Sequence, residues 1–284
     1  MTIQRREFLK VGAVTTGTLL TGAGRALATT KSRQRVPIGF QLYSLRGEFA
    51  KDVPNTLKNV AEIGYAGVEF WGYNGTPAVY KEWTAKQLRK LLDDNGLKCC
   101  GMHMSVKALQ DENFQRTVEL NKVLGNKFMN VAAASREMKT PDSIKKFAQF
   151  MSDRAAKAAL LEMVVGYHCH PFDMVRFGDQ FGWEIFFSTV SPKVAMQLDM
   201  GNCAAGGGDP IAILKEFPHR ARTVHIKEFD DAVWAPGNPQ WLEIFKLCET
   251  TQPIEWYIVE QGGSGGNGFE IPRECLQKLK KMHK

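Results

Sequence analysis

Four side chains that can bind a metal ion or move a proton stand at the ends of apolar runs in this 284-residue chain. They are two imidazoles and two carboxylates, separated by 31, 26 and 35 residues: His168, Asp199, His225 and Glu260. Imidazole nitrogens and carboxylate oxygens together suit a divalent first-row metal ion, and the same groups act as general acids and bases. The sequence therefore predicts a metal centre built from these four residues, with Glu260 also available as a catalytic base.

Each of the four residues has an ordinary structural explanation when it is taken singly. A histidine in an apolar run is more often a hydrogen-bonded core residue, and a carboxylate at a strand end often caps a helix. Four such groups at matching places are harder to explain in this way, because each would need its own buried partner. Side chains two residues apart on a strand share a face, which places His170 beside His168 and Lys227 beside His225. We expect His170 and Lys227 to contact the substrate.

Short apolar runs alternate with longer amphipathic ones from residue 37 onward. The predicted strands are 37–43, 66–71, 97–103, 127–132, 163–168, 193–199, 222–227 and 255–260. The predicted helices are 53–63, 84–95, 112–124, 141–161, 172–187, 209–216, 239–249 and 270–282. Helix start signals agree with this division, because Thr84 and Thr140 stand at expected N-cap positions and Pro141 stands at a first helical position.

This strict alternation predicts an α/β fold with a parallel sheet, because each parallel crossover needs a dozen or more residues. Eight such units between residues 37 and 284 match a single-domain (β/α)8 TIM barrel. A doubly wound open sheet is the alternative, but no glycine-rich dinucleotide fingerprint follows an early strand. In a TIM barrel the active site lies at the carboxyl ends of the strands, so the four candidate ligands would meet at one mouth.

Residues 1–28 differ in composition from the rest of the chain. Arg5-Arg6 precedes an apolar run rich in Gly, Ala and Thr, and Ala26-Leu27-Ala28 has the small-residue pattern of a cleavage site. This pattern predicts a twin-arginine signal peptide, followed by a short leader over residues 29–36. The run from Val11 to Leu20 is too short to span a bilayer. We therefore expect the twin-arginine translocation machinery as a partner, no stable membrane span, and an exported protein in the bacterial periplasm.

The charge distribution bears on possible binding partners, and the cysteine content bears on disulfides and metal ligands. The formal net charge is +7, but Lys and Arg are scattered along the predicted helix surfaces, so we expect no nucleic-acid partner. We interpret the six cysteines, which include no CxxC pair, as buried thiols, although an exported protein can also form disulfides. Cys169 and Cys203 lie beside the candidate centre, so thiolate ligation is a second option. The sequence does not indicate the oligomeric state.

Five motifs follow predicted strands or include their ends: GFQLYSLR at 39–46, GVEFW at 67–71, LDMGN at 198–202, VHIKE at 224–228 and IVEQ at 258–261. Together they resemble motifs of the xylose isomerase-like sugar phosphate isomerase/epimerase family of barrels. The resemblance implies a divalent metal, Mn²⁺ first, with Fe²⁺, Co²⁺, Zn²⁺ or Mg²⁺ as alternatives. It also implies the ligands Glu, Asp, His and Glu on the last four strands, and Asp199, His225 and Glu260 match the last three of these.

The first ligand position departs from the family pattern, because His168 stands where the family has a carboxylate that epimerases also use as an acid or base. Moving a proton between adjacent carbons needs a base and a group that returns the proton on the correct face. Glu260 supplies one base. The second group is His168 if it does not bind the metal, Glu69 at the end of the second predicted strand, or His103 at the end of the third. The resemblance also implies a substrate contact at His103.

Three functions fit these observations. The first is a metal-dependent isomerase or epimerase that removes a proton next to a carbonyl of an unphosphorylated sugar or keto-sugar, since an exported enzyme meets free or glycosidic carbohydrate. The second is a lyase that cleaves a 3-keto-glycoside by elimination, for which one strong carbon base suffices. The third is a non-catalytic carbohydrate-binding barrel. In each case the substrate or ligand is a small carbohydrate, and Tyr43 and Trp71 are candidates for contact with a sugar face, with core packing as the alternative.

Overall fold

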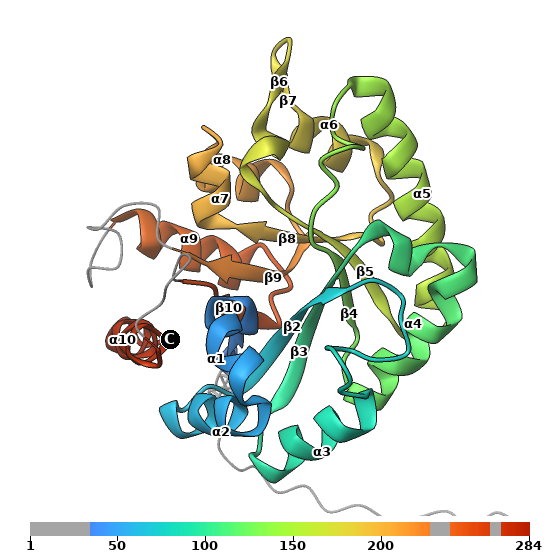
Figure 1. The fold of residues 1–284 in the computed structure, drawn as a ribbon. Coiled ribbons are helices and arrows are strands. Elements are labelled where there is room, and N and C mark those ends of the chain that lie inside the picture. The colour runs from blue at the N-terminus through green and yellow to red at the C-terminus, as the bar shows by residue number, and fades with distance from the viewer. Residues whose placement is uncertain (1–34, 228–238, 262–267) are drawn as a thin grey trace, which may run out of the picture. The chain divides into compact units, whose positions relative to one another are not determined.

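Eight parallel strands form a closed barrel in the computed structural model, which describes residues 35–227, 239–261 and 268–284 (Figure 1). The order around the barrel is β1-β10-β9-β8-β5-β4-β3-β2. The strands are β1 (Ile38–Gln41), β2 (Gly67–Tyr73), β3 (Lys98–Met104), β4 (Phe128–Val131), β5 (Val164–His168), β8 (Ala195–Asp199), β9 (Ala221–Ile226) and β10 (Trp256–Val259). All eight predicted strands are confirmed, as is the TIM barrel that they form. The barrel closes where β1 pairs with both β2 and β10.

Helices follow the strands and surround the barrel (Figure 1). Their bounds are α1 (Arg46–Lys51), α2 (Val53–Ile63), α3 (Ala85–Asp94), α4 (Asp111–Leu124), α5 (Pro141–Ala159), α6 (Gly182–Thr189), α7 (Met200–Ala205), α8 (Pro210–Glu216), α9 (Pro239–Thr250) and α10 (Glu270–Lys281). Two predicted helix starts are confirmed, because Thr84 and Thr140 each form a reciprocal capping box with the residue three positions later. The short helices α1 and α7 have no counterpart among the predicted helices.

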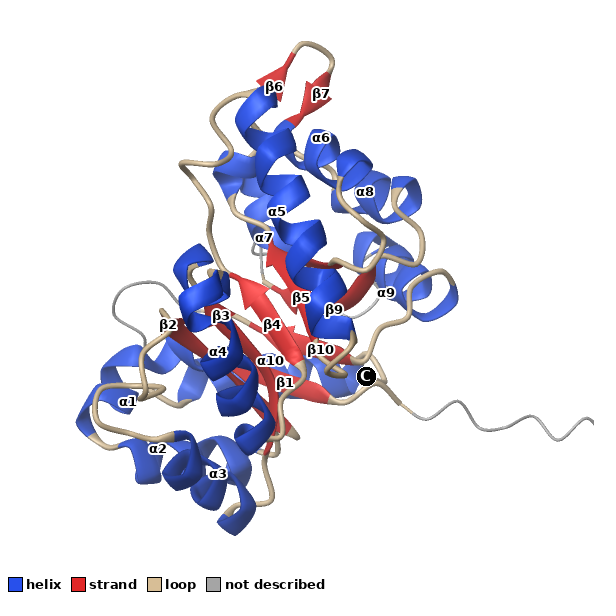
Figure 2. Cartoon of the chain, turned by 90° about the vertical axis from the view of Figure 1, so that its right-hand side faces the viewer, coloured by secondary structure: helices blue, strands red, loops and turns tan. Residues whose placement is uncertain are grey.

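The predicted helix at 172–187 is wrong in its first half. A 3-10 turn, Pro171–Met174, is followed by a short antiparallel pair, β6 (Arg176–Phe177) and β7 (Gln180–Phe181), which extends away from the barrel (Figure 2). Helix α6 begins only at Gly182. Gly178 has a φ of +66°, in the left-handed region that a tight hairpin turn requires and that glycine adopts at little cost. The apolar residues on both sides of this turn also fit a helical period, so the sequence predicted a helix instead of the hairpin.

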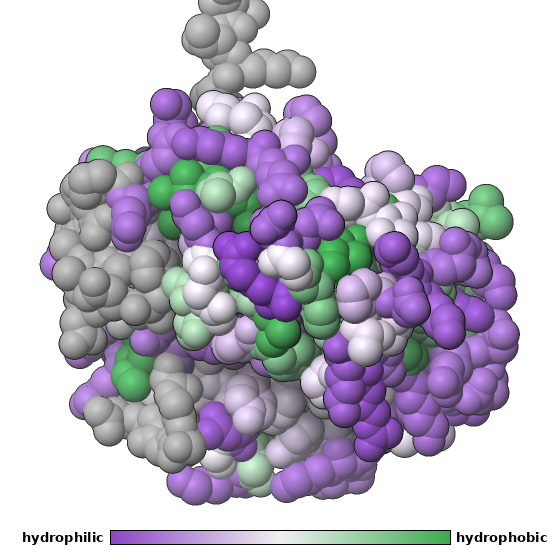
Figure 3. All heavy atoms as spheres, turned by 90° about the horizontal axis from the view of Figure 1, so that it is seen from above, coloured by the Kyte–Doolittle hydropathy of each residue, from purple (hydrophilic) through white to green (hydrophobic). Residues whose placement is uncertain are grey.

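The hydrophobic core is one cluster of buried apolar side chains from the barrel strands and from the helices around them. Among the described residues, the large apolar side chains that are exposed stand apart in the sequence: Tyr43, Val123, Leu160, Val175 and Leu242. The face seen in Figure 3 is mostly hydrophilic. All six cysteines are buried and free, which confirms their interpretation as thiols. Within the described ranges, no helix has the length and apolar character needed to cross a membrane.

Residues Arg35–Lys284 form one compact unit. The predicted signal peptide, and all of the predicted leader except its last two residues, lie outside the described residues. All four candidate ligands lie within this unit.

Candidate metal centre

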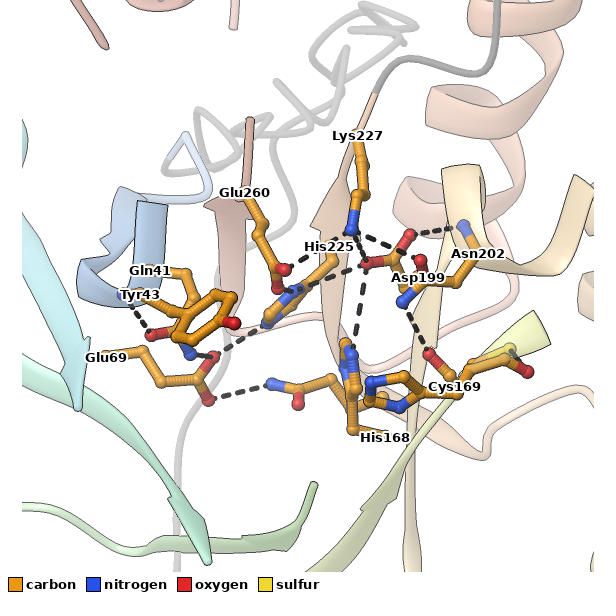
Figure 4. A network of polar contacts seen from close by, with 12 residues as sticks. Gln41, Tyr43, Glu69, His168, Cys169, Asp199, Asn202, His225, Lys227 and Glu260 are labelled. Atoms are coloured by element: carbon orange, nitrogen blue, oxygen red, sulfur yellow. Dashed lines mark hydrogen bonds and ion pairs between the residues drawn. The ribbon is translucent and has the colours of Figure 1, made fainter. Parts of the chain in front are cut away.

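The four predicted ligands converge at the carboxyl ends of four consecutive barrel strands (Figure 4). His168 and Asp199 are the last residues of β5 and β8, His225 lies near the end of β9, and Glu260 directly follows β10. One donor atom from each residue lies within 4.8 Å of the donor atoms of the other three. The predicted convergence at the mouth of the barrel is what the structure shows.

The distances between these donor atoms fit a single ion. Asp199 Oδ2 lies 3.9 Å from His168 Nε2 and 3.8 Å from His225 Nδ1, and His225 Nδ1 lies 2.8 Å from Glu260 Oε2. Donor atoms bound at 2.0–2.2 Å to one ion are roughly 3–4 Å apart. A divalent ion can therefore be held here by this chain's own side chains.

Asp199 shows how the local fold prepares one ligand. Its Oδ1 accepts the backbone N–H of Asn202 at 2.7 Å and so caps the N-terminus of α7. Its Oδ2 is buried and has no hydrogen-bond partner. Buried carboxylate oxygens are rarely left in this condition, because the desolvation cost is not recovered. This oxygen lies 3.8–3.9 Å from His168 Nε2, His225 Nδ1 and Lys227 Nζ, too far for a hydrogen bond, and faces the gap between the two imidazoles where an ion would lie.

Burial and close contacts shift the pKa values of the clustered groups. Burial, and then the nearby charge of Glu260, raise the pKa of Asp199 to about 7. Burial alone would raise the pKa of Glu260 too, but contacts with His225 and Lys227 outweigh it and hold that pKa well below its usual range. The pKa of His168 is lowered well below its usual value, first by burial and then by His103 and His225, so its imidazole is neutral and can bind a metal.

Lys227 lies above the ligands rather than on the cavity wall. Its Nζ is 3.3 Å from Glu260 Oε1, 3.1 Å from Asn202 Oδ1 and 3.8 Å from Asp199 Oδ2 (Figure 4). Burial would lower the pKa of Lys227, but the two carboxylates outweigh it and raise that pKa, so the side chain is an ammonium ion. Its predicted contact with the substrate stays a prediction.

A cavity of about 280 Å³ adjoins the centre. Its lining residues are Tyr43, Trp71, Gly72, His103, Ala132, Ala133, His168, His170 and Glu260. The structure therefore brings together the predicted substrate-contacting residues, apart from Lys227. The rings of Tyr43 and Trp71 meet edge to face at 6.1 Å, and Tyr43 is 46% exposed at the rim. This exposure is unusual for an aromatic residue that serves only core packing.

Glu69, a sequence-based candidate for the second acid or base, lies beneath the centre rather than on the cavity wall. It is completely buried and is not among the residues that line the cavity. Its Oε2 lies 2.7 Å from His225 Nε2, on the opposite side of that ring from the donor cluster. The contact is that of a carboxylate supporting a metal-binding histidine from behind.

Sequence reasoning missed a set of amide side chains around Glu69: Gln41, Asn130 and Gln197. Strand parity offered one signal, because Gln197 is two residues before Asp199 and shares its face. The thiolate option is not supported, because the donor groups found among the described residues contain no cysteine. Burial also raises the pKa of Cys169 well above its usual value, which keeps it a thiol.

A family model described as the xylose isomerase-like TIM barrel matches residues 57–281. The chain belongs to this family. The closed eight-stranded barrel described above is the fold that the description of this xylose isomerase-like family names. No curated protein matches the chain.

Solved structures with the same fold include several sugar enzymes. A sugar phosphate isomerase/epimerase from Parabacteroides distasonis is 23% identical with a TM-score of 0.70, over 89% of this chain and 96% of that one. An L-ribulose 3-epimerase is 16% identical with a TM-score of 0.62, over 88% and 95% of the two chains. A 3-keto-D-glucoside 4-epimerase from E. coli is 15% identical with a TM-score of 0.60, over 87% and 99%. At these identities the likeness establishes a shared fold.

Proposed function

We propose that this protein is a divalent-metal-dependent isomerase or epimerase that moves a proton next to the carbonyl of an unphosphorylated sugar or keto-sugar. The observation that carries the proposal is the four-donor cluster at the mouth of the barrel, whose buried Asp199 Oδ2 has no hydrogen bond, beside a cavity of about 280 Å³. The names of the structural neighbours support a sugar as the substrate class.

The residues of the centre divide the work between binding and proton movement. A divalent ion held by the cluster would polarise a carbonyl oxygen and stabilise the negative charge that develops on it. Glu260 is the carboxylate that borders the cavity and is the proposed acceptor of the proton from carbon. Its lowered pKa keeps it ionised, while the contacts with His225 and Lys227 that lower this pKa also weaken it as a base. His103 and His170 border the same cavity and can exchange protons with the substrate. Tyr43 and Trp71 offer apolar surface for a sugar ring.

The charges near the cavity favour a substrate without phosphate. No Lys or Arg lines the cavity among the described residues. Two nearby cations already have partners, because Lys227 contacts Glu260 and Asn202, and Arg46 lies over the Tyr43 ring and donates to the Tyr43 carbonyl. The two segments outside the described residues in this half of the chain, 228–238 and 262–267, contain no Lys or Arg either. A phosphate dianion is usually met by Arg, Lys or a helix N-terminus. We therefore propose a substrate without a phosphate group, although one structural neighbour is named a sugar phosphate isomerase/epimerase.

Elimination from a 3-keto-glycoside is the second candidate. The cavity wall holds one carboxylate, Glu260, and three imidazoles, from His103, His168 and His170. A single carboxylate can remove the proton from carbon, and an imidazole can protonate the departing glycosidic oxygen. The same wall serves an epimerase if an imidazole returns the proton to carbon, so the product must decide between the two reactions.

The deciding experiment follows candidate keto-sugars and keto-glycosides by NMR in D₂O with protein loaded with Zn²⁺, which is diamagnetic; reactions with Mn²⁺-loaded protein are read after the ion has been removed. Deuterium at carbon with a new sugar establishes isomerisation or epimerisation, and release of the aglycone establishes elimination. Binding shifts without exchange or turnover would instead indicate a carbohydrate-binding barrel. An Asp199→Ala variant serves as the metal-free control, and unchanged metal content in it would refute the four-ligand centre.

We also propose that the protein is exported through the twin-arginine route and works in the periplasm. The support is the sequence of residues 1–28 alone. Replacing Arg5 and Arg6 by Lys should retain the protein in the cytoplasmic fraction of a bacterial host. Equal export of the double variant would refute the proposal without affecting the one for the barrel.

A further inference from the structure

A single buried carboxylate joins two histidines beneath the candidate centre. Glu69 Oε2 lies 2.7 Å from His225 Nε2 and 3.2 Å from His103 Nε2. The two imidazole rings are stacked, with their centroids 5.1 Å apart and their planes 8° from parallel. Both rings therefore turn the same nitrogen, Nε2, toward one acceptor.

The orientation of the Gln197 amide determines which ring nitrogen of His103 carries the hydrogen. Gln197 Nε2 donates to Glu69 Oε1 at 3.0 Å and to Thr223 Oγ1 at 3.0 Å, so the amide cannot be flipped without setting its oxygen against a carboxylate. Its oxygen therefore faces His103 Nε2, at 2.7 Å. An amide oxygen only accepts hydrogen bonds, so His103 must carry its hydrogen on Nε2.

Glu69 is itself held in place on all sides. Gln41 Nε2 donates to its Oε2 at 2.9 Å, while the oxygen of the same amide accepts the backbone N–H of Tyr43. Asn130 Nδ2 contributes a donor 3.3 Å from Oε1. A glycine makes room for the carboxylate on β3, since a Cβ at Gly101 would lie 2.1 Å from Glu69 Oε1. The carboxylate thus has a fixed orientation, set from β1, β3, β4 and β8.

We propose that Glu69 is a positioning residue that holds both stacked histidines in the Nε2–H form. In the structure His225 Nδ1 also lies 2.8 Å from Glu260 Oε2, a contact that places a hydrogen on Nδ1 as well. Because Glu69 keeps the hydrogen on Nε2, metal binding displaces the hydrogen on Nδ1 and leaves that nitrogen as the ligand. The Nε2–H form equally leaves Nδ1 as the basic nitrogen of His103, a residue of the cavity wall, where it accepts a hydrogen bond from a sugar hydroxyl. The hydrogen bond from a sugar hydroxyl to His103 rests on the proposed function. The assignment of the two tautomers does not depend on it.

The direct test reads the tautomers in the intact protein. Protein labelled with ¹⁵N at histidine and loaded with Zn²⁺, which is diamagnetic, is examined by two-bond ¹H–¹⁵N correlation, with His103→Gln and His170→Gln variants for assignment. We expect Nε2–H patterns for both His103 and His225. An Nδ1–H pattern for His103 would overturn the proposal. No substrate is needed, so failure of the proposed reaction would leave this result standing.

A variant pair tests whether Glu69 is the cause. Glu69→Gln should mix the tautomers of His103 and weaken Zn²⁺ binding by roughly 10- to 100-fold, the usual effect of losing a carboxylate behind a ligating histidine. The matched control is Glu62→Gln, the same substitution at an exposed carboxylate of α2 that pairs with Lys58, and it should leave both patterns and Zn²⁺ binding unchanged. A folded Glu69→Gln protein with unaltered tautomers would refute the assignment. If that variant does not fold, the wild-type spectrum still decides.

Discussion

Replacing Asp199 by Asn should have opposite effects on the metal-free and the metal-loaded protein. Burial and the charge of Glu260 raise the pKa of Asp199 from 3.8 to about 7. Between these values the folded state keeps a proton that the unfolded chain has lost, so the metal-free fold loses stability as the pH rises from about 4 to 7. A pKa difference of this size lowers the free energy of unfolding of the metal-free protein by about 4 kcal/mol at pH 8. Asn keeps the side-chain shape and an oxygen for the Asn202 N–H, but it carries no charge.

We therefore expect the Asp199→Asn variant to be more stable than the wild type in chelator at pH 8, by about 2–4 kcal/mol once relaxation is allowed for. The advantage should shrink at pH 5, where the wild-type carboxyl is largely protonated in the fold. Excess Mn²⁺ should stabilise the wild type, by about 2.7 kcal/mol at one hundred times its Kd, and leave the variant almost unchanged. The assay is urea unfolding at both pH values, with chelator or Mn²⁺. Equal stabilisation of both proteins by Mn²⁺, or a variant less stable than the wild type in chelator at pH 8, would contradict the reasoning.

The remaining predictions concern other parts of the same site. His168→Ala should lower the bound Mn²⁺ measured by elemental analysis, whereas His170→Ala, on the cavity wall but outside the donor cluster, should keep the metal and lose turnover. Lys227→Met removes a positive charge 3.3 Å from Glu260 and should tighten Mn²⁺ binding in calorimetry; weaker binding would show that the ammonium organises the ligands. Gly101→Ala should destabilise the fold by about 1–3 kcal/mol or more, since its Cβ meets a fixed carboxylate. Its control, Gly47→Ala, meets nothing within 4 Å in helix α1 and should stabilise by about 0.5–1 kcal/mol in the same unfolding assay.

The barrel and the ligands could be predicted because their signals are local. Each strand is an apolar run of its own, and His168, Asp199 and Glu260 stand where such runs end. The TIM barrel then places strand ends together without any knowledge of side-chain contacts. The hairpin before α6 escaped prediction because it depends on one glycine within a run that also fits a helical period.

The place of Glu69 could not be predicted, because its partners come from distant strands. Gln197 is 128 residues away along the chain and His225 is 156 residues away. The sequence shows a carboxylate near a strand end, and this is equally compatible with a base in a cavity and with a support beneath it. Only the side to which the carboxylate turns decides between these roles, and packing against Gly101 sets that side.

The pairing of β1 with β10 also has a consequence for the order of assembly. Three of the ligands lie on β5, β8 and β9, but Glu260 follows β10, the last strand to be synthesised. Gln41, which helps to orient Glu69, lies on β1, and Gln261 donates its backbone N–H to Ser44 just beyond that strand. A growing or truncated chain that lacks β10 would therefore have an open sheet and an incomplete ligand set. Tight metal binding should consequently appear only after the barrel has closed, as a late step in folding.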